Sequence, residues 1–364
     1  MKIKEIISHL ELLAPPSLQE SYDNSGLIVG NQEQELSKAL ICLDSTEAII
    51  DDAIKNRCNL VIAHHPILFS GIKSLTGKNY IERTILKAIK NDVAIYAIHT
   101  NLDNVMNGVN HKLAEKLNLE NCKILNPRSD LLKKLVFFCP LNAAEKVKNT
   151  IFEAGAGKIG AYDCCSFQVE GNGNFRAGNN SNPHVGKKGE IHVEPELRIE
   201  TVFESYLENR VINSLLDSHP YEEVAYDLYS VSQKWHEVGS GMIGELSEGL
   251  DTEEFLDFLK LKLNIPFIRH TQIIKTKVKK IAICGGSGSF LLSKAIDQKA
   301  DLFISADFKY HQFFDANKQI TIVDIGHYES EQYTAEHIAE YLQEKIPNFA
   351  PYLSTINTNP INYR

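Results

Sequence analysis

The sequence predicts an α/β fold made of two similar halves, with an α+β domain inserted between them. In the first and last thirds of the 364 residues, apolar strand-like runs alternate with helix-like segments, the order expected of a parallel α/β sheet. The pattern changes near Pro127 and the first pattern returns after Trp235. We therefore predict an N-terminal half over 1–127, an insert over 128–236 and a C-terminal half over 237–364.

The composition is that of a folded chain, because 43% of the residues are hydrophobic and 23% are charged. A net charge of -9 argues against a broad nucleic-acid interface, which needs a basic face. No apolar run approaches the length of a membrane span, and residues 1–10 do not resemble a signal peptide. The seven cysteines include no C-x-x-C pair, so we expect reduced thiols in a cytoplasm rather than disulfides or a cysteine-rich zinc site.

The N-terminal half is expected to alternate helices with parallel strands joined by right-handed crossovers. Ser45 or Thr46 is a suitable cap for the helix that follows the first long strand. The predicted elements are, in order, a helix over 1–14, a short apolar piece over 27–29, a strand over 38–43, a helix to 57, a strand from 60, a helix over 79–91, a strand over 92–98 and a helix from 107 to 117.

The insert has a different element order, β-α-β-β-α-β, which is typical of a ferredoxin-like domain. We expect strands over 132–139, 164–169, 196–203 and 225–231, with helices over 142–154 and 204–217.

The C-terminal half repeats the pattern of the N-terminal half. Strands are predicted over 280–284, 301–305 and 319–325, and helices over 290–299 and 331–345. Ile41-Cys42 aligns with Ile283-Cys284, and His65 aligns with Asp307. If the halves form one unit, a site between them collects residues that are far apart in the sequence.

The strand from Leu60 to Ala63 runs directly into His64 and His65. Its unbroken apolar run predicts a strand covered on both faces, and ligands of open α/β sheets bind at the carboxyl ends of such strands. One of the two histidines could simply be a satisfied core or surface residue. Two neighbouring imidazoles at one strand end instead favour a site for a transition metal ion.

Two further strand ends carry a histidine and a carboxylate four residues apart, His99-x-x-x-Asp103 and His327-x-x-x-Glu331. Residues with this spacing share one face of a helical turn, so each pair could chelate one ion, and a carboxylate can bridge two ions. The alternatives are structural. His99 could cap a helix, Asp103 could bind backbone amides, and Glu331 could lie in the first turn of a helix because the helix dipole favours a carboxylate there.

Three other motifs have open interpretations. The loop Gly285–Ser289 lies between a strand and a helix, as phosphate loops do, but it matches no full phosphate-binding pattern and could be a plain tight turn. The segment His219–Glu223 is expected to be structural, as the entry to the last strand of the insert. Asp44 could orient a metal ligand or cap a helix.

The motifs "AHHPILFSGIKSL", "AIHTNLDN", "DIGHYESE" and "YDNSGLIVG" resemble those of the Nif-three-like family of dinuclear-metal hexameric proteins, often named GTP cyclohydrolase type 2 homologues. The insert, including "DSHPYEEVAYDLY", resembles the PII/CutA-like domain of the long bacterial members. The resemblance implies a toroidal homohexamer whose metal centres face an interior cavity. It also implies these metal ligands: His64, His65, Asp103, His327 and Glu331, with His99 as a further ligand or a neighbour that orients the ligands.

These observations lead to a functional expectation with an alternative. We expect two divalent ions per subunit (Zn, Fe or Mn) and hydrolysis of a nucleotide-like small substrate, such as the ring opening of GTP implied by the resemblance. His99 is our candidate for moving the proton, as imidazole often does. The alternative is a non-enzymatic metal-handling or regulatory ring, with the insert as a sensor or gate. The sequence alone identifies no substrate.

Overall fold

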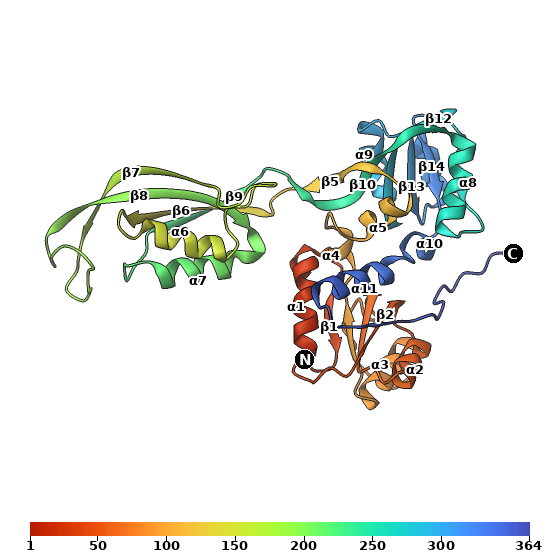
Figure 1. Cartoon of the computed structure of the whole chain (residues 1–364), viewed down its shortest axis with the longest axis horizontal. Helices are drawn as coiled ribbons and strands as arrows, with labels where there is room; N and C mark the ends of the chain where they lie inside the picture. Colours follow the sequence, from red (N-terminus) through yellow and green to blue (C-terminus); the bar gives the residue numbers. More distant parts are fainter. The chain divides into compact units, whose positions relative to one another are not determined.

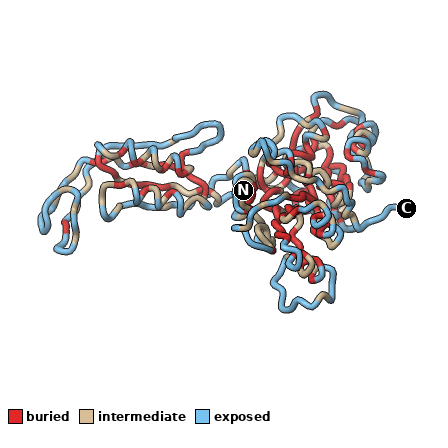
Figure 2. Tube along the Cα trace, turned by 60° about the horizontal axis from the view of Figure 1, so that its bottom comes forward, coloured by how far each residue is buried: buried red, intermediate tan, exposed pale blue.

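The computed structural model describes residues 1–364 and divides the chain into two compact units. One unit combines 1–127 with 236–364, and the other comprises 128–235. His236, which we had assigned to the insert, therefore belongs to the first unit. Buried residues are concentrated inside each unit (Figure 2). None of the helices is long and apolar enough to cross a membrane.

The N-terminal half contains a five-stranded sheet with the order β1-β4-β3-β2-β15. Its strands are β1 (Gly26–Val29), β2 (Ala39–Asp44), β3 (Leu60–His65), β4 (Ala94–Ala97) and β15 (Tyr352–Leu353). β2, β3 and β4 pair in parallel, whereas β1 lies antiparallel to β4 at the edge. The carboxyl ends of β3 and β4 therefore meet at one side of the sheet, and this is where His64, His65 and His99 lie.

The helices of this half are α1 (Ile3–Leu13), α2 (Glu47–Lys55), α3 (Tyr80–Lys90), α4 (Thr100–Asp103) and α5 (Val109–Lys116). Thr46, one of the two predicted capping residues, accepts a hydrogen bond from the Ile49 amide at the start of α2. Asn79 caps α3 in the same way, through the Glu82 amide. These side chains satisfy amides that have no partner within the helix.

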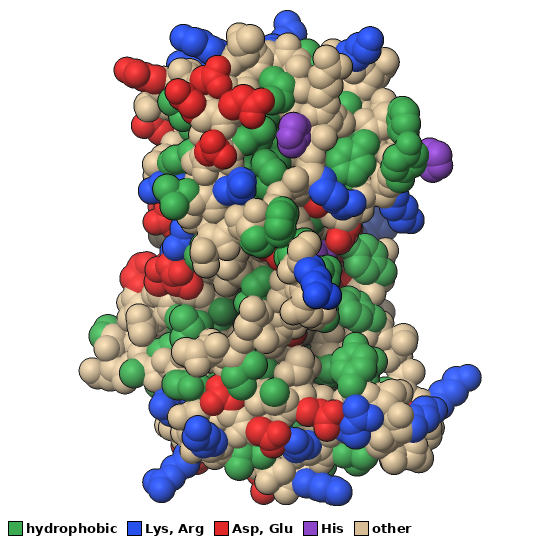
Figure 3. Space-filling view, turned by 90° about the vertical axis from the view of Figure 1, so that its right-hand side faces the viewer, with side chains coloured by type: hydrophobic (Ala, Val, Ile, Leu, Met, Phe, Trp, Pro, Cys, Tyr) green, Lys and Arg blue, Asp and Glu red, His purple; other side chains and the backbone are tan.

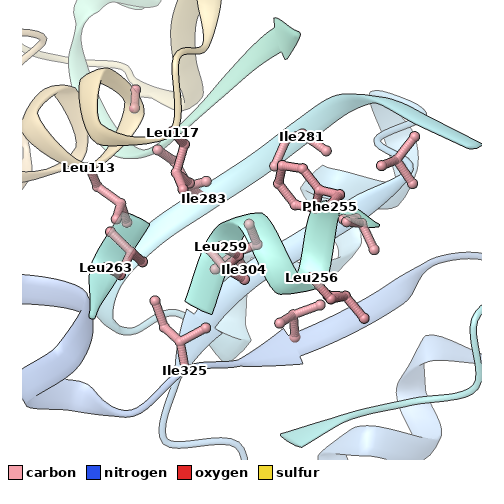
Figure 4. Packing of buried hydrophobic residues seen from close by; sticks show 14 of the residues in the cluster. Leu113, Leu117, Phe255, Leu256, Leu259, Leu263, Ile281, Ile283, Ile304 and Ile325 are labelled. Atoms are coloured by element: carbon pink, nitrogen blue, oxygen red, sulfur yellow. The ribbon is translucent and has the colours of Figure 1, made fainter. Parts of the chain in front are cut away.

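The C-terminal half contains a six-stranded sheet with the order β11-β14-β13-β12-β10-β5. Its strands are β5 (Glu120–Arg128), β10 (Trp235–Asp251), β11 (Arg269–His270), β12 (Lys277–Ser287), β13 (Leu302–Ala306) and β14 (Thr321–Asp324). Its helices are α8 (Thr252–Leu263), α9 (Leu292–Asp297), α10 (His327–Glu331) and α11 (Thr334–Lys345). Figure 4 shows α8 packing through Phe255 and Leu259 onto the strand residues Ile281 and Ile304.

The predicted internal repeat is visible in the strand pairing. β12, β13 and β14 are parallel and follow one another across the sheet, as β2, β3 and β4 do. In both halves an antiparallel strand that precedes the trio in sequence flanks its third strand, β1 beside β4 and β11 beside β14. His99 follows β4 and His327 follows β14, so the two motifs with the spacing His-x-x-x-carboxylate occupy equivalent places in the two halves.

The insert contains a four-stranded antiparallel sheet with the order β7-β8-β6-β9. Its elements are β6 (Leu132–Pro140), α6 (Ala144–Glu153), β7 (Ser166–Arg176), β8 (Ile191–Glu204), α7 (Glu208–Ser218) and β9 (Tyr226–Val231). α6 and α7 cover one face of this sheet (Figure 1), and their apolar residues form its core. The element order is the expected one, whereas the kinship with PII/CutA-like domains stays a prediction. β7 extends well beyond the predicted strand over 164–169 because it pairs with β8 as far as Arg176.

Candidate metal centre

The three predicted strand-end motifs come together between the two halves of the first unit. They line a cavity of about 990 Å³, to which His65, His99, Asp103, His327 and Glu331 all contribute. His64 lies behind them with no exposed surface. The chain thus brings together all six of the predicted site residues, although more than 220 positions separate the first motifs from the last one.

One group of ligand atoms is formed by His64, Asp103 and Glu331. His64 Nδ1 lies 2.8 Å from the Ile98 carbonyl oxygen and donates to it, which leaves Nε2 as a lone-pair donor for a metal ion. This Nε2 and Asp103 Oδ1 are both buried without a hydrogen-bond partner, and they lie 3.7 Å apart. Glu331 Oε2 is 3.9 Å from the same nitrogen.

Two buried, unpartnered atoms that face each other are costly unless something lies between them. Ligands of one tetrahedral ion at bond lengths near 2.1 Å are separated by about 3.4 Å, close to the spacing of His64 and Asp103. The donor set therefore fits a divalent cation.

A second group consists of His65, His327 and Glu331. Glu331 Oε2 lies 3.0 Å from His65 Nε2 and 3.2 Å from His327 Nε2, and the two nitrogens are 3.4 Å apart. The other ring nitrogen of each histidine is held by a carboxylate, at 2.7 Å by Asp44 for His65 and at 2.6 Å by Asp307 for His327. Carboxylates that hold Nδ1 in this way fix the ring and strengthen Nε2 as a ligand.

Glu331 belongs to both groups through the same oxygen atom. Its position depends on the carboxyl end of β12, where a Cβ atom on Gly286 would lie 2.4 Å from Glu331 Oε1. Gly286 also has a φ of +61°, which disfavours any other residue there. The amides of Gly285 and Gly286, which were expected in a loop but lie in β12, donate to Asn110 and Ser330, so these two groups are engaged within the chain rather than directed at a phosphate.

His99 is held by a network that sequence reasoning did not find. Its Nδ1 lies 2.7 Å from an oxygen of Asp23, whose other oxygen accepts hydrogen bonds from the Thr100 amide and hydroxyl. Nitrogen atoms of His64, His65 and His99 lie within 4.8 Å of one another. His99 can therefore act as a further ligand or as a proton-transferring group beside the ligands.

Carboxylates surround His65 and His327, the two histidines that share Glu331. Burial lowers the pKa of His65, but its hydrogen bonds to Asp44 and Glu331 outweigh burial and raise this pKa to about 10. His327 follows the same balance, and its bonds to Asp307 and Glu331 raise its pKa to about 11. Without a cation, the two imidazoles are thus protonated at neutral pH and balance the surrounding carboxylates.

The more deeply buried group is electrically different. Burial lowers the pKa of His64 to about 3, so this imidazole is neutral at physiological pH. Burial and the Glu331 charge raise the pKa of Asp103 well above its usual value. For Glu331, burial works in the opposite direction to the hydrogen bonds from His327 and His65, and these bonds keep its pKa well below the usual value.

The family model Duf34/NIF3 (NGG1p interacting factor 3) matches residues 1–360. The chain belongs to the Duf34/NIF3 family. Proteins named "GTP cyclohydrolase 1 type 2 homolog" from Halalkalibacterium halodurans and Staphylococcus epidermidis are 35% and 36% identical to it. The alignment covers 98% of both chains in the first case and 100% of both in the second.

Solved structures give the same family fold. A Bacillus cereus protein related to NIF3 is 36% identical, with a TM-score of 0.88 over 100% of this chain and 99% of that chain. A Staphylococcus aureus protein is 32% identical, with a TM-score of 0.79 and the same coverage. The predicted family membership and α/β class are therefore confirmed.

Besides Asp23, three residues at this NIF3 centre were missed or left open by sequence reasoning. Asp44 holds His65 rather than capping α2, and it also accepts a 2.5 Å hydrogen bond from Thr358 in the C-terminal segment. Asp307 had been aligned with His65 in the repeat, but we assigned it no role. A short polar segment such as the one around Thr358 carries no sequence signal of a distant carboxylate partner.

Proposed function

We propose that this Duf34/NIF3 protein binds two divalent cations per chain, of the Zn, Fe or Mn class, and hydrolyses a nucleotide-like small substrate. The observation that supports this most is Glu331, which is shared by two groups of nitrogen and oxygen ligands at the wall of a large cavity. When bound, two such cations activate water and stabilise negative charge that develops in the transition state.

The cavity supports a substrate that contains a flat ring. Five aromatic side chains line it, namely Tyr22, Phe69, Tyr80, Phe290 and Tyr328. Several of them are largely exposed in the single chain, so their apolar area is available for stacking on a planar heterocycle. The relatives' name, GTP cyclohydrolase 1 type 2 homolog, agrees with a nucleotide-like substrate for this chain.

We assign proton transfer to His99. Asp23 holds its Nδ1 and orients the ring, so the other ring nitrogen is free to give or take a proton at the cavity. Phe69 lies edge-on against the ring at a centroid distance of 5.7 Å.

We further propose a cytoplasmic homohexamer in which the centres face an interior cavity, as the family resemblance implies. The seven cysteines are all free thiols, in agreement with a reducing compartment. Acidic and basic side chains are interspersed on the face of the molecule in Figure 3, without the continuous basic surface that nucleic acid requires.

The test compares metal-loaded and metal-stripped protein on a panel of nucleoside triphosphates and phosphoesters. We expect turnover only with metal, and in His99→Ala a fall of about 100-fold or more, the usual effect of losing a positioned acid–base group, with metal content kept. His270→Ala, which alters an exposed histidine outside the cavity, is the control and should match the wild type.

Two outcomes would contradict the proposal at different points. Absence of metal-dependent turnover on the whole panel would argue against the hydrolase and favour the non-enzymatic metal-handling ring. Full metal retention in both His65→Ala and Glu331→Ala would refute the metal centre itself.

A further inference from the structure

The insert contains a cavity of its own that has no part in the metal centre. Its volume is about 460 Å³, within the range of small-molecule sites. It lies between the end of β7, the loop that follows β7, and the segment that connects α7 with β9. The segment His219–Glu223, expected to be structural, provides part of its wall.

The cavity lies on the face of the sheet that α6 and α7 leave uncovered. Side chains alternate between the two faces of a strand. Phe137 of β6 and Leu197 of β8 belong to or pack against the helix-covered core, so their neighbours Phe138 and Glu196 point to the opposite face. Both of these neighbours line the cavity.

Glu196 is a buried carboxylate without a cation. Only 8% of this residue is exposed, and no lysine, arginine or histidine lies within ion-pair distance of it. A Cβ atom on Gly173 would lie 2.0 Å from Glu196 Oε2, so the glycine makes the space that the carboxylate occupies. A buried charge of this kind is costly unless a partner of opposite charge compensates it.

Aromatic rings surround the same space. The Tyr221 ring lies 5.1 Å from His219, 6.0 Å from His184 and 6.4 Å from Phe175, measured between centroids. His219 is fixed by the Phe138 carbonyl oxygen on one nitrogen and by the Tyr221 amide on the other. These bonds hold the His219 ring in place before any ligand binds. The faces of aromatic rings attract cations, so this wall is suited to a positively charged ligand.

The remaining charges at the wall are mostly of the same sign as Glu196. Glu222 and Glu223 also line the cavity, and Arg176 is the one lysine or arginine among the lining residues. Glu222 accepts a 2.7 Å hydrogen bond from the Asn182 amide, which ties the loop after β7 to this wall. This balance disfavours an anion, and no group of three metal-ligating side chains gathers here.

We propose that the insert binds a small organic cation, an ammonium or guanidinium compound of metabolite size, with its charge at Glu196 and its carbon skeleton against Tyr221 and Phe175. The carboxylate supplies the compensating charge and the rings supply apolar and cation–π contact. The site does not depend on the metal centre, so its occupancy can be tested whether or not the proposed hydrolase activity exists.

The test is isothermal titration calorimetry of the full-length protein with putrescine, agmatine and tetramethylammonium, and with inorganic phosphate as the anionic comparison. We expect at least one cation to bind with a Kd below about 1 mM, a modest affinity for a ligand of this size. Glu196→Gln should weaken this binding by about 10-fold or more, because it removes the buried charge. Glu194→Gln is the matched control, since Glu194 lies on the same strand, pairs with His192 and does not line the cavity.

Gly173→Ala is a second variant that keeps every charge. Its Cβ atom displaces the Glu196 carboxylate, so binding should again weaken while circular dichroism and metal content stay unchanged. The proposal is overturned if none of the three cations binds the wild type, if phosphate binds more tightly than they do, or if both variants bind as the wild type does.

Discussion

Loading the metal-free centre with zinc at pH 7 should release about two protons per chain. The pKa values of about 10 for His65 and about 11 for His327 mean that both imidazoles are protonated at this pH. A metal ligand must be deprotonated, so each of them has to lose one proton when an ion binds. His64, whose pKa is about 3, is already neutral and contributes none. A protonated Asp103 would add to this number, because its pKa is raised.

The magnitude follows from this count. Two protons released when the ion at His65 and His327 binds make the apparent affinity of that ion rise about 100-fold for each pH unit, below the pKa values of the two histidines. The assay is calorimetric titration with zinc in phosphate and in Tris, whose heats of protonation differ, because the difference in measured heat gives the protons released. Removing one donor in His327→Asn should lower the number by about one, whereas His270→Ala should leave it unchanged.

A release of well under one proton per chain, or an affinity that is flat between pH 6 and pH 8, would refute this reasoning. It would mean that the two imidazoles are neutral in the metal-free protein and that other groups compensate the negative charge of Glu331.

Four further predictions address the same fold. The raised pKa values of the two imidazoles stabilise the metal-free protein fully below pH 6.5, and this stabilisation should be lost as the pH rises through 10 to 11, as denaturant titrations can measure. Gly286→Ala should displace Glu331 and remove most of the metal, whereas Gly71→Ala, where a Cβ meets nothing within 4 Å, should retain it. Thr358→Val should weaken metal binding by about 10-fold through the loss of a bond to a carboxylate that holds a ligand, with the folded state unchanged in circular dichroism. A chain in which a short linker replaces 128–235 should stay folded and keep its metal, and aggregation would contradict this division.

The position of the ligands could be predicted because it follows from local patterns. An apolar run that ends in two histidines predicts a strand with both histidines at its carboxyl end, and β3 confirms that placement. The carboxylates behind the histidines could not be predicted in the same way. Asp23 and Asp307 reach their histidines only because separate elements pack together, and a lone aspartate in a loop is common without such a role.

The missed elements have physical explanations too. β10 contains four glycines, which are unfavourable in strands, and its conformation depends on pairing with β12. The helix α8 begins with a capping residue, because Asp251 accepts hydrogen bonds from the amides of Glu253 and Glu254. We assigned no element there. The end of the insert also depends on pairing that the sequence does not show. Val238 already belongs to the first unit, where it forms a bridge with Val105.

The central claim is that two cations share Glu331, and anomalous X-ray scattering at the metal edge from crystals of the loaded protein tests it most directly. We predict two peaks per chain, about 3.5–4 Å apart as in other two-metal sites. One peak should lie between His64, Asp103 and Glu331, and the other between His65, His327 and Glu331. A single peak, or two peaks of which one is not in contact with Glu331, would contradict the account.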